Sequence, residues 1–151
     1  MNRKEKALKL YQSGYNCAQS IVGAFEDLLE KRTNTMIDMA TGFGGGMGRL
    51  QQTCGAVSGA FMVMSSLYNQ SEKSSKEQLN HDIQYFARTF NHIHGDLNCK
   101  NLIEYNLNDP EEHELAKRNR IFEKKCTQFI ETSVELVEDI LKSAQEYTHD
   151  I

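Results

Sequence analysis

The strongest constraint on the fold is the helical spacing of apolar residues along much of the chain. One stripe runs through the last third at intervals of three, four or seven residues: Phe122, Cys126, Phe129, Ile130, Val137 and Leu141. Another runs through the middle: Leu79, Ile83, Phe86, Phe90 and Ile93. This spacing gathers apolar side chains on one face of a helix, which must pack against other helices. Few residues favour strands, and proline occurs once in the chain, so we predict an all-α fold.

Capping signals divide the chain into five or six predicted helices. The expected segments are Lys4–Ser13, Asn16–Leu29, a turn with a short helix over Thr33–Ala40, Thr53–Leu67, Leu79–Ile93, a short helix over Asn98–Ile103, and a long helix from Asp109 toward Tyr147. Gly95 is placed to end one helix, and Asp109-Pro110 to begin the last. Ser71–Ser75 is expected to be a polar loop. No linker divides the chain, so residues 1–151 are expected to form a single-domain bundle.

Composition excludes several classes of function. The net charge is -4 and the pI is about 5.7, which argues against a nucleic-acid partner because such proteins carry a basic face. No apolar run is long enough for membrane insertion. Residues 3–6 are charged, but no apolar stretch of the kind found in a secretory signal follows them,. We therefore expect a cytoplasmic protein, whose thiols stay reduced unless they are catalytic, sensing or metal-bound.

A glycine-rich loop is expected between the second and third long helices. Five glycines lie within residues 41–49: Gly42, Gly44, Gly45, Gly46 and Gly48. The segment lacks the Gly-Lys-Ser/Thr ending of a phosphate-binding loop and the preceding strand of a dinucleotide-binding one. It can instead serve a sharp bend or a close approach between helices. Alternatively, the backbone of Gly44, Gly45, Gly46, Gly48 and Gly55 can approach a cluster and donate N–H bonds to its sulfur atoms, and Arg49 would add positive charge there.

The four cysteines are the best candidates for chemistry. Cys17, Cys54, Cys99 and Cys126 contain no Cys-x-x-Cys pair, so a zinc finger or ribbon is not indicated,. The first three each follow a potential capping residue: Asn16, Thr53 and Asn98. Their thiols are therefore expected in the first turns of helices, where the positive dipole end favours a thiolate. Cys126 is expected to face the core, where the other three can meet it in a partly enclosed pocket.

Three such helix ends converging would stabilise a thiolate-bound iron–sulfur cluster. The simpler interpretation is that buried free cysteines act as small apolar side chains. Four histidines are further metal-ligand candidates, although a solvated role is favoured for them: His81, His92, His94 and His113. No Ser/His/Asp or Cys/His catalytic motif is visible, so enzymatic activity is left undecided.

The segment Thr53-Cys54-Gly55-Ala56-Val57-Ser58-Gly59-Ala60 resembles the CGAxxG motif of a redox-active family labelled C_GCAxxG_C_C. Members have four characteristic cysteines, matched here by one before the motif, one in it and two after. The flanking segments 14–19 and 43–48 also resemble the family. The label writes Gly-Cys-Ala where this chain reads Cys54-Gly55-Ala56, and we take the order in this chain as the motif.

The resemblance implies a helical domain with a redox role. A similar cysteine domain occurs in split-Soret cytochromes c, but this chain lacks the Cys-x-x-Cys-His that attaches c-type haem,. The first hypothesis is electron transfer or redox sensing through an iron–sulfur cluster, of the two-iron type, ligated by Cys17, Cys54, Cys99 and Cys126. The second is metal-free thiol–disulfide chemistry between an unassigned pair. The third is a structural Cys₄ zinc domain or interaction module. A redox partner protein is implied but unidentified, and homo-oligomerisation stays open.

Overall fold

The computed structural model describes the backbone of residues 1–71 and 75–149, with side chains in these ranges up to residue 144. The helical segments are α1 (Arg3–Gln12), α2 (Cys17–Ala24), α3 (Glu26–Leu29), η1 (Glu30–Arg32), α4 (Thr33–Met39), η2 (Ala40–Phe43), α5 (Gly55–Gln70), α6 (Lys76–His94), α7 (Cys99–Ile103), α8 (Pro110–Arg118), η3 (Phe122–Cys126) and α9 (Thr127–His149). Within the described ranges there is no strand, only an isolated antiparallel bridge between Thr53 and Asn98. The predicted all-α class is confirmed, but the count of five or six helices is not, because short helices and breaks divide the chain further.

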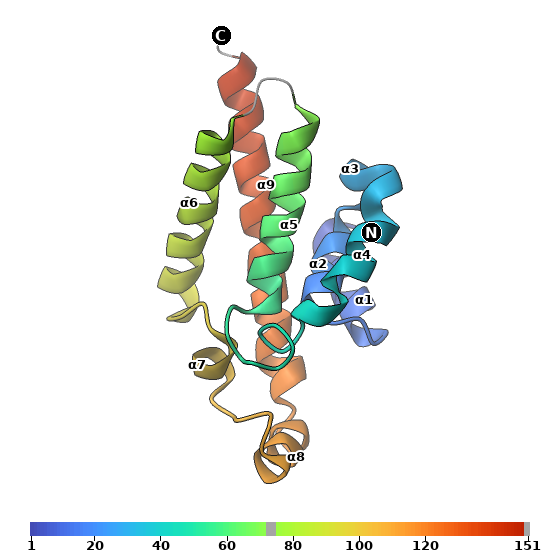
Figure 1. Ribbon diagram of the computed structural model, residues 1–151, viewed down its shortest axis with the longest axis vertical. Coiled ribbons are helices and arrows are strands. Elements are labelled where there is room, and N and C mark those ends of the chain that lie inside the picture. Colours follow the sequence, from blue (N-terminus) through green and yellow to red (C-terminus); the bar gives the residue numbers. More distant parts are fainter. Residues whose placement is uncertain (72–74, 150–151) are drawn as a thin grey trace.

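Three long helices, α5, α6 and α9, run side by side, and α1–α4 cover another side of α5 and α9 (Figure 1). The short helices α7 and α8 lie at one end of this bundle. Ring contacts hold α6 against its neighbours: the centroid of Phe86 lies 5.5 Å from that of Phe61, and Phe90 lies 6.1 Å from Phe129. None of the helices in the described part of the chain is long and apolar enough to cross a bilayer.

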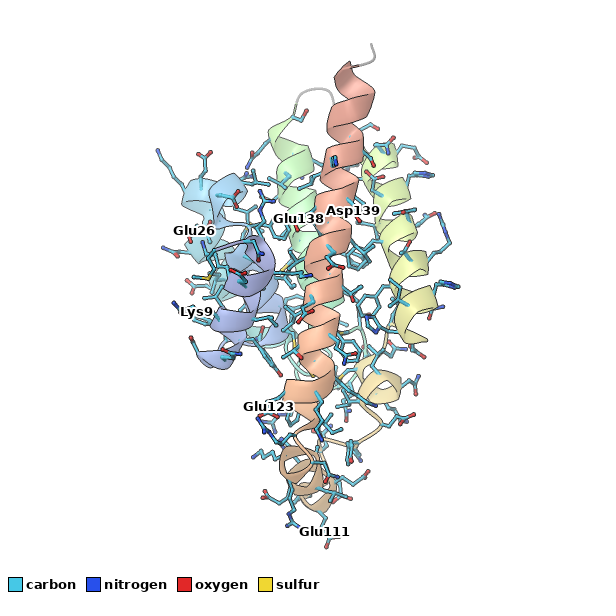
Figure 2. The ribbon with its side chains drawn as sticks, turned by 180° about the vertical axis from the view of Figure 1, so that it is seen from behind. Lys9, Glu26, Glu111, Glu123, Glu138 and Asp139 are labelled. Atoms are coloured by element: carbon cyan, nitrogen blue, oxygen red, sulfur yellow. The ribbon has the colours of Figure 1, made fainter. Side chains whose placement is uncertain are left out.

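An ion pair joins α1 to the long last helix. The Arg3 guanidinium contacts Glu138 of α9 at 2.9 Å and Asp27 of α3 at 2.7 Å. Figure 2 shows α9 in front, with Glu138 along its length. These partly exposed pairs contribute little to stability individually.

Several predicted helix boundaries are confirmed. Asn16 caps α2 with the expected capping box. Its side chain accepts from the Gln19 N–H, and the side-chain oxygen of Gln19 accepts from the Asn16 N–H. Gly95 ends α6 in the left-handed conformation, with φ 92°. Asp109 caps α8, and its side chain accepts from the Glu111 N–H. The predicted loop at Ser71–Ser75 lies largely outside the described residues.

Two boundary predictions are wrong. Thr53 does not cap a helix; it pairs with Asn98, and Cys54 takes the N-cap position of α5. The long helix expected from Asp109 is broken, because α8 ends at Arg118, with Asn119 as its C-cap, and Arg120 adopts a left-handed φ of 56°. One π-helical turn, η3, then leads into α9.

Candidate four-cysteine site

All four cysteines line one pocket of about 630 Å³. Cys17 and Cys99 are the first residues of α2 and α7, Cys54 is the N-cap of α5, and Cys126 ends η3. The first three therefore begin helices, as predicted, and those helix ends lie at the same end of the bundle (Figure 1). Cys54, Cys99 and Cys126 are buried, whereas Cys17 is partly exposed. The five glycines predicted to approach a cofactor, Gly44, Gly45, Gly46, Gly48 and Gly55, also line this pocket.

The glycines of the CGAxxG motif bring Cys17 beside Cys54. A Cβ on Gly59 would lie 2.8 Å from the Ala18 carbonyl oxygen and 3.0 Å from the Ala18 Cα. A Cβ on Gly55 would lie 3.1 Å from the Cys17 Cβ. Gly55 and Gly59 are four residues apart and so share one face of α5. The motif therefore creates a flat face on which the first turn of α2 rests, with one cysteine from each helix at the crossing.

The bridge between Thr53 and Asn98 brings Cys99 to the same place. The Cys54 N–H donates to the Leu97 carbonyl at 2.8 Å, and the Cys99 N–H donates to the Gln52 carbonyl at 2.7 Å. These bonds run between segments more than forty residues apart. They fix the start of α7 against the start of α5.

Residues 45–49 form a run of left-handed backbone along the pocket. Gly45, Gly46 and Gly48 have φ values of 62°, 68° and 58°, and Met47 and Arg49 adopt φ values of 67° and 59°. Left-handed backbone costs an L-residue other than glycine roughly 1–2 kcal/mol, so three of the five positions avoid that cost by being glycine. The chain coils back on itself here, and the Gly48 N–H donates to the Gly42 carbonyl at 2.8 Å.

Gln51 ties this segment to the loop after α7. Its side chain is buried, with its amide nitrogen donating to the Tyr105 carbonyl at 2.7 Å and its oxygen accepting from the Leu107 N–H at 2.8 Å. It also hydrogen-bonds the Cys99 thiol. Sequence reasoning missed Gln51, because nothing local marks a glutamine whose partners lie some fifty residues away.

Cys17, Cys126 and Tyr11 form a hydrogen-bonded group at the pocket wall. The Cys17 thiol and the Tyr11 hydroxyl both donate to the Cys126 sulfur, and these bonds lower the pKa of Cys126. The same contact with Cys126, together with burial, raises the pKa of Cys17. Burial and the two nearby thiols raise the pKa of Tyr11. Cys126 is therefore the thiol of this group best placed to carry negative charge, and Tyr11 is a site residue that the sequence did not reveal.

Cys54 and Cys99 differ from that group. Burial raises the pKa of Cys54 to about 12, although backbone hydrogen bonding from Ala56 and Val57 opposes the shift. Burial likewise raises the pKa of Cys99 to about 11. Both thiols are neutral near pH 7 in the absence of a positively charged ligand. A bound metal would reverse this, because a coordinating thiol is deprotonated.

The four thiols are a donor set that more than one metal group uses. Across residues 1–71 and 75–144, no three Cys, His, Asp or Glu side chains are placed to hold a metal ion. Four cysteine thiolates are the ligands of a structural Cys₄ zinc site and also of an iron–sulfur cluster.

The other candidate residues divide between pocket and surface. His113 is half-buried, lines the pocket and contacts the ring of Phe122, with centroids 6.1 Å apart. His81 and His92 are exposed, and His94 packs between α6 and α9 away from the pocket lining. Arg49 lines the pocket but is itself exposed. Of the four candidate histidines, His113 therefore lies in the same pocket lining as the thiols, and His81, His92 and His94 do not.

Comparison with known proteins gives one match. Residues 15–140 match the family model described as putative redox-active protein (C_GCAxxG_C_C). No curated protein and no solved structure matches the chain. The matched range includes all four cysteines and the whole glycine-rich segment.

Proposed function

The chain belongs to the C_GCAxxG_C_C family of putative redox-active proteins, and on that premise we propose that its four cysteines hold one iron–sulfur cluster for electron transfer or redox sensing. The observation that carries this proposal is the meeting of four thiols, from four separate segments, in the lining of one pocket. Nothing local in the sequence brings them together. A core that used cysteines only as small apolar residues would not need to gather all four.

The surroundings of the thiols support an anionic group. Helices α2 and α5 begin at the pocket with Cys17 and Cys54, and that end of a helix favours negative charge,. The first N–H groups of the short helix α7 are already used, since Cys99 donates to the Gln52 carbonyl and Lys100 to the Gln51 carbonyl. Backbone hydrogen bonding from Ala56 and Val57 favours the thiolate of Cys54, because it lowers the pKa of this thiol against the effect of burial. Hydrogen bonds to sulfur are one of the means by which a protein tunes the potential of a cluster.

Each part of the site would have its own task. Cys17, Cys54, Cys99 and Cys126 would hold the cluster, which supplies one-electron chemistry when bound. The glycine backbone of residues 44–48 would lie close to it, and Tyr11 would keep its hydrogen bond to the Cys126 sulfur. Leu102, Ile103 and Phe129 line the same pocket and would exclude water from it.

The test is chemical analysis of protein purified without oxygen. Iron and acid-labile sulfide are expected in stoichiometric amounts, with a visible absorption that bleaches on addition of dithionite. Each Cys→Ser variant at the four positions should lose most of the iron. Ser65→Ala, on α5 but outside the pocket lining, is the matched control and should keep it. Zinc without sulfide would contradict the cluster and support the structural Cys₄ alternative.

Metal-free thiol–disulfide chemistry is the second candidate. It is supported by the interaction between Cys17 and Cys126, which raises the pKa of Cys17 and lowers that of Cys126, in the lining of one pocket. Colourless, iron-free protein with a reversible disulfide, even when prepared without oxygen, would select this function over the first.

A further inference from the structure

Helix α7, which begins with Cys99, is too short to be stable by itself. It has five residues, Cys99–Ile103, whereas an isolated helix shorter than about 12 residues is marginal in water even when its sequence is favourable. Its C-cap, Glu104, adopts a left-handed φ of 62°, so the chain turns away directly after the helix. Leu102 and Ile103 are buried and hold the apolar side of α7 against the core. The positions of its two ends, and with them that of Cys99, therefore depend on contacts from other segments.

Gln51 bonds to the chain on both sides of α7, which lies beside the coil that precedes α5 (Figure 1). At the start of α7, the Gln51 backbone carbonyl accepts from the Lys100 N–H at 3.0 Å. After its end, the Gln51 side chain accepts from the Leu107 N–H at 2.8 Å and donates to the Tyr105 carbonyl at 2.7 Å. The Gln51 N–H in turn donates to the Gly45 carbonyl at 3.1 Å. One residue thus joins the glycine-rich segment, α7 and the loop after α7, all of which line the four-cysteine pocket.

The two bonds to the loop after α7 need a donor and an acceptor on one side chain. A glutamine amide supplies both, whereas a methionine of similar length offers only a weak acceptor. Gln51 and Leu107 are each only 6% exposed, so a lost bond would leave a buried polar group without a partner. Asn108 makes a second link, because its side chain donates to the Arg49 carbonyl at 2.8 Å, but Asn108 is exposed. The buried link between these segments is therefore the one made by Gln51.

We propose that Gln51 is a positioning residue, which holds both ends of α7 and thereby keeps Cys99 in the pocket lining before any metal is bound. This inference rests on the proposed function of the four cysteines, and it adds to the site a residue outside that set. Gln51 acts through Cys99 and needs no contact with a cluster. Its loss is therefore expected to appear in the metal-free chain, as a local opening that exposes Cys99 while the other three cysteines stay protected.

The matched variants are Gln51→Met and Gln52→Met. The Gln52 side chain is exposed, and its backbone also bonds to the glycine-rich segment and to α7, so the comparison isolates the buried amide of Gln51. Reduced, metal-free protein is labelled with iodoacetamide under native conditions, and each cysteine is followed by mass spectrometry of its peptide. Cys99 should react roughly tenfold faster in Gln51→Met than in the wild type, and at the wild-type rate in Gln52→Met. An unchanged rate at Cys99, or an equal acceleration at all four cysteines, would overturn the inference.

Hydrogen exchange of the metal-free wild type tests the same contacts without a substitution, and so decides the question even if Gln51→Met fails to fold. The amides of Gln51, Lys100 and Leu107 should show one common protection factor, because they are released together when the contacts of Gln51 open. Rapid exchange at Leu107 beside slow exchange at Lys100 would contradict the proposed role. Iron and sulfide content, measured separately in anaerobic protein, tests the proposed function, so that a chain without a cluster would contradict that function and not the role of Gln51.

Discussion

His94 is a histidine held inside the bundle by aromatic rings. Its ring centroid lies 4.7 Å from that of Phe90 and 4.9 Å from that of Phe129, and its Nε2 lies 2.9 Å from the Thr132 hydroxyl. Burial lowers the pKa of His94. Because the folded chain disfavours the charged imidazole, protonation of this residue opposes folding.

The chain should therefore lose stability as the medium becomes mildly acidic. In the unfolded chain His94 takes up a proton near pH 6.5, whereas in the folded chain it does so only at lower pH. The contribution of His94 is thus fully present above the unfolded pKa and is lost as the pH falls below it toward the lower pKa of the folded chain,. Urea unfolding at a series of pH values from neutral to mildly acidic should show a smaller decline for His94→Gln than for the wild type. His92→Gln, at an exposed position two residues away, should leave the decline unchanged, and equal slopes in all three proteins would contradict the assignment.

Residues with local partners were predictable, and those with distant partners were not. The capping box at Asn16 involves only Gln19, three residues away, so the sequence pattern identified it. Thr53 has the same capping chemistry, but its pairing with Asn98 overrides it. Tyr11 and Gln51 reach the cysteines only through the tertiary fold, and no local pattern distinguishes them from other polar residues.

The crossing of α2 and α5 depends on the absence of two side chains. Gly59→Ala should place a Cβ against the backbone of Ala18, which cannot move aside as a flexible side chain would. Overpacking costs about 1–3 kcal/mol, and the better helix propensity of alanine returns about 1 kcal/mol. We expect a net loss of up to about 2 kcal/mol in the free energy of unfolding, measured by urea denaturation.

Gly42→Ala is the matched control for this substitution. An added Cβ at Gly42 meets no atom within 4 Å, and its φ lies outside the left-handed region. Its stability should equal that of the wild type or slightly exceed it. If both variants lost the same amount, the effect would belong to glycine replacement in general and not to the helix crossing.

Element type was predictable where apolar spacing was sustained, as in α6. The break between α8 and α9 was not, because the apolar stripe of the last helix begins only at Phe122 and the polar residues before it are compatible with a continuous helix. The left-handed conformation of Arg120 interrupts the helix. Arginine is a residue that favours helices, so the sequence does not indicate a break at this position. The π-turn that follows shifts the register just before Cys126.

At the scale of the molecule, the composition and spacing sufficed for the all-α class but not for the arrangement of the helices. The prediction that Cys126 faces the core followed from its stripe, and Cys126, Phe129 and Ile130 are indeed buried. The meeting of α2, α5 and α7 at one end depends on glycine-mediated crossing and one backbone bridge. These contacts join distant segments, and a single sequence does not record which segments meet.

The four thiols of the pocket come from four segments that are far apart in the sequence. A ligand that needs all four thiols can therefore bind only while the chain is folded. A ligand that binds only when all four are together stabilises the folded chain by RT ln(1 + [L]/Kd). The filled protein should therefore melt at a higher temperature than the metal-free protein, and a chelator that removes the iron should abolish the difference. Equal melting temperatures in both forms would contradict the linkage. If the proposed cluster is present, losing it would lower the stability of the whole chain and not only of the pocket.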